Sequence, residues 1–308
     1  MSFNAVFDKA EIILTEGALV ERLKSEFHLK MDGAVNHAGL IYSHPEILSM
    51  LYRQYIDIAQ KQGFPIMIMT PTRRVNAESM ARSKFANKPL LADSIKLLSR
   101  VRSEYGDYQS RILLGGLLGC KGDAYSGEKV MDTSEAYEFH TQQTRQFIDQ
   151  RIDFLFAGIM PEINEAEGMA RAMAETGIPY IISFMVRKEG TMLDGTVLID
   201  AIKRIDENVD PGPVCYMANC IHPANLRLAL LNQPNLHYLN RFKGIQANAS
   251  ILSPEELNNC PVVEQDDFNH LVNEMYQIKK QFELKIVGGC CGTNNEFISI
   301  LADKLKEI

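Results

Sequence analysis

The chain has 308 residues, of which 46% are hydrophobic and 23% are charged, so its composition is that of a soluble globular protein and excludes a largely disordered one. It carries 32 basic and 39 acidic residues, giving a formal net charge of −7. With no run of lysines or arginines, this balance argues against nucleic acid or a membrane as a partner. Residues 1–10 lack the apolar core of a signal peptide and no window reaches membrane-spanning length, so we expect a cytoplasmic protein.

Short apolar runs rich in β-branched residues recur along the chain, and we predict that each forms a strand. In chain order they cover residues 11–14, 65–70, 111–118, 153–159, 179–186, 213–219, 242–247 and 284–287. Helical periodicity fills the segments between them, at residues 45–62, 76–105, 133–152, 164–176, 196–208, 223–232, 266–282 and 294–308. Asp132 and Ser253 each precede carboxylates in the pattern of a helix start.

This alternation predicts a (β/α)8 TIM barrel. A doubly wound open sheet is the competing arrangement, but it would want a phosphate-binding glycine motif after the first strand, and none is present. No low-complexity linker divides the chain. We therefore predict a single barrel domain over residues 1–308.

The catalytic groups of such barrels come from the carboxyl ends of the strands. At these ends the chain has polar and charged residues, as a substrate pocket requires. The predicted substrate-binding residues are Glu16, Gly17, Thr70, Thr72, Arg73, Arg74 and Asn219.

Three cysteines also fall at predicted strand ends, where they would converge across the mouth of the barrel. Cys220 follows the sixth strand, and Cys290 and Cys291 follow the eighth, which suggests a three-thiolate zinc site. Three protein ligands leave one tetrahedral position open, the pattern of a catalytic zinc. The electron-rich centre would activate a thiol better than a water, and a bound thiol would lose its proton.

Two other interpretations of these cysteines remain. Cys290 and Cys291 could form a vicinal disulfide, or the cysteines could pack as small hydrophobic residues. Six cysteines in a chain of this length favour free thiols or metal ligands over a disulfide framework. The other three, Cys120, Cys215 and Cys260, are assigned to packing or to the surface.

The segment from Gly288 to Thr293, with Asn219 and Cys220 upstream, resembles the homocysteine S-methyltransferase family. Members are zinc-dependent barrels that move a methyl group onto the thiol of homocysteine. The resemblance covers nearly the whole chain and implies that Cys220, Cys290 and Cys291 bind Zn²⁺. It also implies an S-methyltransferase whose partners are a small-molecule thiol acceptor and a methyl donor, free or carrier-bound. The sequence leaves a homo-oligomer open.

The chain departs from the family pattern at three strand ends. Glu16 replaces the family's aspartate, and Gly158 stands where the family has a glutamate that helps to hold the amino group of homocysteine. Arg73 and Arg74 stand where the family has aromatic residues, and arginine suits a carboxylate, sulfonate or phosphate unless it points to solvent. The acceptor is therefore expected to be homocysteine or a related thiol.

Two alternative functions use the same residues. One is a zinc-dependent hydrolase that uses metal-bound water, with Glu16 as the general base. The other is a zinc-containing binding protein without catalytic activity. In the methyltransferase interpretation, Glu16 orients an ammonium or sulfonium group unless it serves a helix dipole, and Asn219 orients the pocket unless it forms a turn.

Overall fold

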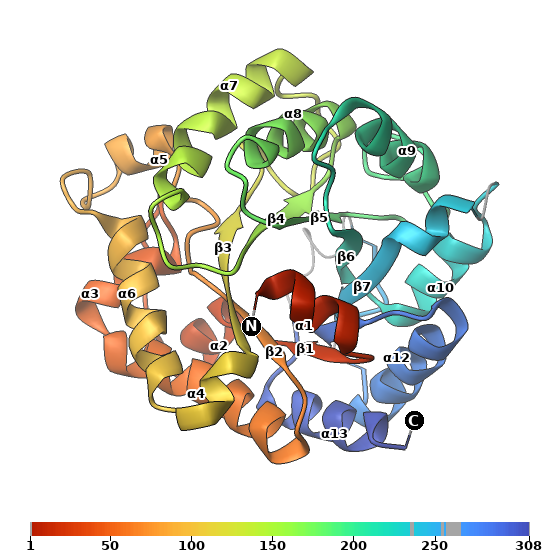
Figure 1. Cartoon of the computed structure of the whole chain (residues 1–308), viewed down its shortest axis with the longest axis horizontal. Helices are drawn as coiled ribbons and strands as arrows, with labels where there is room; N and C mark the ends of the chain where they lie inside the picture. The colour runs from red at the N-terminus through yellow and green to blue at the C-terminus, as the bar shows by residue number, and fades with distance from the viewer. Residues whose placement is uncertain (1, 235–236, 254–255, 257–265, 308) are drawn as a thin grey trace.

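The computed structural model describes the whole chain except residues 1, 235–236, 254–255, 257–265 and 308. Eight parallel strands close into a barrel in the order β1 to β8, and the helices form a ring around it (Figure 1). The strands are β1 (Ile13–Thr15), β2 (Ile66–Met69), β3 (Ile112–Leu118), β4 (Phe154–Met160), β5 (Tyr180–Phe184), β6 (Cys215–Ile221), β7 (Phe242–Ala247) and β8 (Ile286–Gly289). The predicted TIM barrel is confirmed.

The helices before the midpoint of the chain are α1 (Phe3–Lys9), α2 (Val20–Ser25), α3 (Leu40–Ser43), α4 (Pro45–Gln62), α5 (Ala77–Arg82), α6 (Leu90–Ser103) and α7 (Thr133–Thr144). Those after it are α8 (Ile163–Ala174), α9 (Leu198–Asn208), α10 (Pro223–Leu231), α12 (Phe268–Phe282) and α13 (Asn295–Leu305). Short 3-10 helices are η1 (His37–Gly39), η2 (Gly106–Arg111), η3 (Arg145–Phe147) and η4 (His237–Arg241).

The strands of the barrel are buried throughout, as a parallel sheet covered by helices requires. Ile13 of β1 pairs with Ile286 of β8, so no strand edge is left open. Because all strands run in the same direction, their carboxyl ends meet at one mouth, where the chemistry of such barrels is found.

Two predicted helices are shorter than the sequence pattern suggested. The segment 76–105 is not one helix but α5 and α6, separated around Pro89, whose ring disfavours helical geometry in the residue before it. The segment 133–152 is helical only to Thr144 and continues as η3. The start of α7 is as predicted, because Asp132 accepts hydrogen bonds from first-turn amides and Glu135 bonds back to the Asp132 amide.

The predicted helix start at Ser253 falls partly outside the described residues. The Ser253 amide donates to the Glu256 carboxylate, and the Glu256 amide donates to the Ser253 hydroxyl, which is the reciprocal pattern expected there. Cys260 lies outside the described residues. Among the helices described, none is both long and apolar enough to cross a membrane.

The amino-terminal helix α1 was not predicted, and it lies across one end of the barrel (Figure 1). Its Phe3 side chain is 1% exposed and packs on Phe154 at the start of β4, with ring centroids 4.9 Å apart. Phe3 and Val6 join the apolar cluster that fills the barrel interior. α1 therefore covers the amino ends of the strands, opposite the mouth.

Candidate metal and substrate site

Cys220, Cys290 and Cys291 come together at the mouth of the barrel. Their sulfur atoms all lie within 4.8 Å of one another, and the Sγ atoms of Cys290 and Cys220 are 3.0 Å apart. Cys290 and Cys291 directly follow β8, as predicted. The structure thus assembles a group that could hold a metal ion.

Cys220 lies within β6 rather than after it, because the strand ends two residues later than predicted. Its backbone has φ 58°, in the left-handed region that side chains other than glycine rarely adopt. The pairing of β6 with β7 shifts register between Asn219 and Ile221, around this residue. A local irregularity of this kind redirects a side chain at a strand end, here the Cys220 thiol.

Short contacts hold the loop after β8 in place. The Cys290 amide donates to the Ala247 carbonyl at 2.7 Å, and the Ala249 amide donates to the Cys291 carbonyl at 3.0 Å. Gly292 has φ 74°, and a Cβ atom there would lie 2.8 Å from the Ala249 Cβ. Only glycine fits both requirements, so this residue lets the loop pass close to the neighbouring strand end.

The Cys290 thiol donates a hydrogen bond to the Cys220 sulfur. The pKa of Cys220 is lowered well below its ordinary value, chiefly because Cys290 and then Cys291 donate to its sulfur. The pKa of Cys290 is raised, first by that same hydrogen bond to Cys220. The cluster therefore concentrates negative charge on Cys220, which is the charge that a metal cation would neutralise.

A metal ion fits this group. Zinc binds thiolate sulfur at about 2.3 Å, which places tetrahedral sulfur ligands roughly 3.8 Å apart. The three Sγ atoms lie within 4.8 Å of one another, and those of Cys290 and Cys220, now 3.0 Å apart, would separate by about 0.8 Å to hold the ion. A vicinal disulfide is not formed, since both Cys290 and Cys291 are free thiols.

Tyr125 covers the thiols from the loop between β3 and α7. Its hydroxyl lies 3.3 Å from the Cys220 sulfur and 3.7 Å from the Cys291 sulfur. The negative charge of Cys220, followed by burial, raises the pKa of Tyr125 above its ordinary value. Tyr125 is therefore a protonated donor to the thiolate cluster.

Next to the thiols lies a cavity of about 380 Å³, lined by the ends of several strands. Glu16 is 6% exposed in its wall and accepts a hydrogen bond from the Met69 amide at 3.0 Å. Burial raises the pKa of Glu16 well above its ordinary value. Among the described residues no cationic side chain pairs with it, so a buried carboxyl group faces the cavity without a counter-charge.

A chain of amides and a hydroxyl forms another part of the wall. Asn219 donates through Nδ2 to the Gln246 Oε1, and Gln246 donates through Nε2 to the Thr15 hydroxyl at 3.0 Å. Asn219 is only 4% exposed, yet its Oδ1 has no hydrogen-bond partner within the described structure. A buried acceptor left unpaired is costly, so this oxygen is suited to a ligand donor.

The other predicted substrate-binding residues differ in where they lie. Gly17 and Arg73 line the cavity with Glu16 and Asn219. Thr70 and Thr72 are fully buried; their hydroxyls bond to each other at 2.7 Å and to the backbone of Leu117. Arg74 is exposed and lines a separate hollow. The structure therefore brings four of the seven predicted residues to the cavity.

A family model described as homocysteine S-methyltransferase matches residues 13–305. The chain belongs to the homocysteine S-methyltransferase family. It is accordingly an S-methyltransferase, and the resemblance inferred from the sequence is confirmed.

Two relatives agree with this family, and a solved structure shares the fold. Betaine–homocysteine S-methyltransferase 1 of Bos taurus is 21% identical over 325 residues, which cover 97% of this chain and 73% of the relative. The mouse protein of the same name, from Mus musculus, is also 21% identical, over 96% of this chain and 72% of its own. The metallated form of the homocysteine methyltransferase MmuM from Escherichia coli has a TM-score of 0.77 and 20% identity, over 97% of this chain and 98% of that chain.

In this S-methyltransferase, the packing around Gly158 explains why the position has no side chain. A Cβ atom at this position would lie 2.7 Å from the Phe156 ring and 3.5 Å from a methyl group of Leu117. The space into which a side chain at this position would project is filled by these two apolar residues. A glutamate here would require the cavity wall to be rebuilt.

Several cavity residues were not predicted from the sequence. Tyr125, Glu21, His37 and Gln246 all line the cavity. The pKa of Glu21 is raised to about 7, first by burial and then by the charge of Cys291. Gln246 is the penultimate residue of β7, so including the last two residues of each strand among the candidates would have found it. The other three come from loops or from a short helix, whose positions no local pattern fixes.

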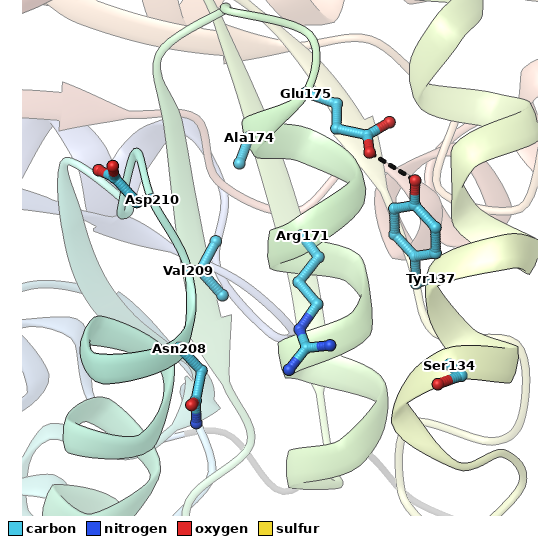
Figure 2. A pocket seen from close by; sticks show the side chains of 8 residues that line it. All are labelled: Ser134, Tyr137, Arg171, Ala174, Glu175, Asn208, Val209 and Asp210. Carbon is cyan, nitrogen blue, oxygen red and sulfur yellow. Dashed lines mark hydrogen bonds between the residues drawn. The ribbon is translucent and has the colours of Figure 1, made fainter.

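A second hollow lies on the outer helical layer of this S-methyltransferase (Figure 2). Figure 2 shows Arg171 between α7 and residues 208–210, with Tyr137 bonded to Glu175. Arg171 also pairs with Glu167 on its own helix. The hollow is lined by helix and loop residues rather than strand ends, and we assign it no part in the chemistry.

Proposed function

We propose that this protein is a zinc-dependent S-methyltransferase that moves a methyl group from a small-molecule or carrier-bound donor to homocysteine or a related thiol. The observation that carries the proposal is the convergence of three free thiols beside a cavity whose only fully buried carboxyl group has no partner cation within the described residues. Family membership supports the reaction class. The bovine relative carries homocysteine in its name.

Cys220, Cys290 and Cys291 would hold the ion. When bound, zinc supplies positive charge that keeps the acceptor sulfur ionised at neutral pH. The donor methyl group then forms a bond with that sulfur while its bond to the donor breaks, and the bonding electron pair stays with the donor. The thiol proton leaves before this step, when the acceptor binds.

Glu16 and Asn219 would bind the ammonium group of the acceptor. Both residues line the cavity; the Asn219 Oδ1 has no hydrogen-bond partner within the described structure, and no cationic side chain pairs with Glu16 there. An ionised Glu16 next to an ammonium group is favourable even though burial raises its pKa, because the two charges compensate each other. Glu16 and Asn219 would thus replace the family's glutamate, which helps to hold the amino group and whose position is taken here by Gly158.

Apolar side chains complete the cavity. Leu117, Phe156 and Ile159 line it together with the polar groups. These side chains would align the two reactants by their shape. They would also exclude water from the sulfur and from the donor methyl carbon, which strengthens each electrostatic contact within the cavity.

Zinc-edge X-ray absorption of the zinc-loaded protein would test this proposal. We expect three sulfur ligands without acceptor and four with homocysteine, together with formation of methionine from homocysteine when S-methylmethionine or betaine is the donor. Cys290→Ala should lose stoichiometric zinc and methyl transfer. Cys215→Ala is the matched control, since Cys215 lies at the start of β6 and is buried away from the thiol group.

Two results would contradict the proposal. Full zinc content in Cys290→Ala would remove the three-thiolate site. A sulfur count that stays at three with homocysteine present would leave the thiol acceptor without a place at the metal.

A further inference from the structure

One wall of the cavity carries polar side chains that have no partner in the protein. Asn36 directly precedes η1, His37 is the first residue of η1, and Arg73 comes from the loop after β2. The Asn36 Oδ1 and the His37 Nδ1 are buried without a hydrogen bond. Within the described part of the chain, the Arg73 guanidinium has neither a hydrogen bond nor an ion pair.

His37 is held neutral in this wall. It is 7% exposed, and burial followed by the nearby Arg73 charge lowers its pKa to about 3. A neutral imidazole has one N–H to donate and one nitrogen that accepts. At neutral pH His37 can therefore donate to an anion beside Arg73 without adding a second positive charge.

The packing of Arg73 directs it into the cavity region. A side chain on Gly119 would collide with the Arg73 Cγ and, at 2.7 Å, with the Arg73 carbonyl, so the stem of Arg73 lies close against the loop after β3. Guanidinium groups bind carboxylates through two parallel hydrogen bonds, and the geometry is planar and specific. An arginine fixed at its stem and free at its head is suited to such a ligand.

The cavity thus has two separate sets of unpaired groups. Glu16 and the Asn219 Oδ1 accept hydrogen bonds and suit a cation, whereas Arg73 and His37 donate and suit an anion. Glu16 projects from the end of β1, and Arg73 belongs to the loop beyond β2. Neither set neutralises the other by an ion pair, because no Glu16–Arg73 contact is formed within the described residues.

We propose that Arg73 and His37 form a subsite that binds the carboxylate of a substrate. This inference rests on the proposed function, since it concerns the cavity that receives the thiol acceptor and the methyl donor. The carboxylate could belong to either of them. A carboxylate on the acceptor would lie on the same molecule as the ammonium group at Glu16, and a carboxylate on the donor would place the donor beside the ionised sulfur.

The test compares matched ligands by calorimetry on the zinc-loaded protein. Homocysteine is compared with 3-aminopropane-1-thiol, which is homocysteine without its carboxylate. In the homocysteine complex, betaine is compared with choline, in which a hydroxymethyl group replaces the carboxylate. Each comparison is made with the wild type, with Arg73→Gln, with His37→Phe and with Arg74→Gln, which removes the same charge outside the cavity.

If the acceptor supplies the carboxylate, wild type should prefer homocysteine over 3-aminopropane-1-thiol by roughly 10- to 100-fold, as expected for a charged hydrogen bond lost. Arg73→Gln should abolish most of this preference, His37→Phe should reduce it, and Arg74→Gln should retain it. If the donor supplies it, the same pattern should appear in the preference for betaine over choline.

The inference is overturned if Arg73→Gln changes neither preference. Failure of the proposed function gives a different result, because homocysteine and 3-aminopropane-1-thiol would then both fail to bind the zinc-loaded wild type. Circular dichroism of each variant at 25 °C separates loss of the subsite from loss of the fold.

Discussion

Glu16 carries a buried carboxyl group, and its function depends on which ligand group binds next to it. The Met69 amide satisfies one oxygen, and burial raises the pKa of the group. A ligand ammonium would pair with the ionised form. At the residue scale, Glu16 is therefore expected to decide between thiols with and without an amino group.

The prediction is that Glu16→Gln weakens homocysteine binding by roughly 10- to 100-fold, the range for a lost charged hydrogen bond. Binding of 4-mercaptobutanoate, which lacks the amino group, should change by less than about threefold. Calorimetry on the zinc-loaded protein measures both. Equal losses for the two thiols would mean that Glu16 shapes the cavity rather than binding the ammonium group.

A glycine is required at position 158 by the packing of neighbouring side chains, and not by a backbone conformation that only glycine adopts. Because a Cβ atom would lie 2.7 Å from the Phe156 ring, Gly158→Ala should destabilise the protein by about 1–3 kcal/mol through overpacking. Gly33→Ala is the control, since a Cβ there has no atom within 4 Å. Urea unfolding of both variants measures the difference, and equal stabilities would show that the Phe156 ring moves aside without cost.

His37 gives the protein a dependence of stability on pH. Its pKa is lowered to about 3 in the folded state, whereas an unfolded chain has histidine near 6.5. Below about pH 6.5 the unfolded state takes up a proton that the folded state does not, so the stability contribution is present at neutral pH and is lost as pH falls toward 3. The slope is up to about 1.4 kcal/mol per pH unit.

We therefore expect the wild type to lose about 2 kcal/mol more stability between pH 7 and pH 5 than His37→Gln does. Urea unfolding at the two pH values measures this difference. His28→Gln, which alters an exposed histidine, is the control. A wild-type loss equal to that of His37→Gln would mean that the buried imidazole becomes protonated without unfolding.

Among the elements, α1 has no clear signal in the sequence, yet its packing is expected to stabilise the folded barrel. Phe3 is 1% exposed and packs on Phe154 across the barrel end. Phe3→Ala should cost about 3–5 kcal/mol, as for other large-to-small changes of buried aromatic residues. Phe7→Ala, at a half-buried position of the same helix, should cost less. Thermal unfolding ranks the two, and the reverse order would place the main contact of α1 elsewhere.

The strands could be predicted because each is a short apolar run, but their ends could not be placed to the residue. β6 and β8 both begin and end two residues later than predicted, so Pro213 and Leu284 belong to the preceding loops. α1 was missed because seven residues give too few turns for a periodic pattern. Local sequence determines that an element exists more firmly than where it stops.

In the candidate site, too, local sequence predicts some residues and leaves others to tertiary structure. The cysteines could be found because their residue type and their place after strands indicate metal binding. The positions of Tyr125 and His37 depend on how the segments between strands and helices fold back over the mouth, and tertiary contacts rather than local sequence set that path. The cysteines that would hold a metal were therefore predicted, as were Glu16, Asn219 and Arg73 in the cavity, whereas Tyr125 and His37 were not.

At the scale of the whole molecule, the barrel does not depend on a metal ion for its closure. Every strand pairs with two neighbours, and the apolar clusters extend throughout the described interior. Removing zinc with a chelator should leave the circular dichroism spectrum unchanged at 25 °C and lower the unfolding midpoint by several degrees, because a ligand of the native state stabilises it by mass action.

The matched control for zinc removal is Cys290→Ala, whose unfolding midpoint should not respond to the chelator. Differential scanning calorimetry with and without chelator measures both proteins. Loss of the folded spectrum in the wild type would assign the ion a structural role instead.

The closure of the amino end by α1 has a kinetic consequence. Phe3 and Val6 pack into that end, and the cavity of the described residues lies at the opposite end, at the mouth with Cys290 and Cys291. Both reactants would pass the same opening, so a donor that bound first would obstruct the path of the acceptor to the thiols. We expect a compulsory order of turnover, in which the thiol enters first, the spent donor leaves before the methylated product, and high donor concentration slows product escape.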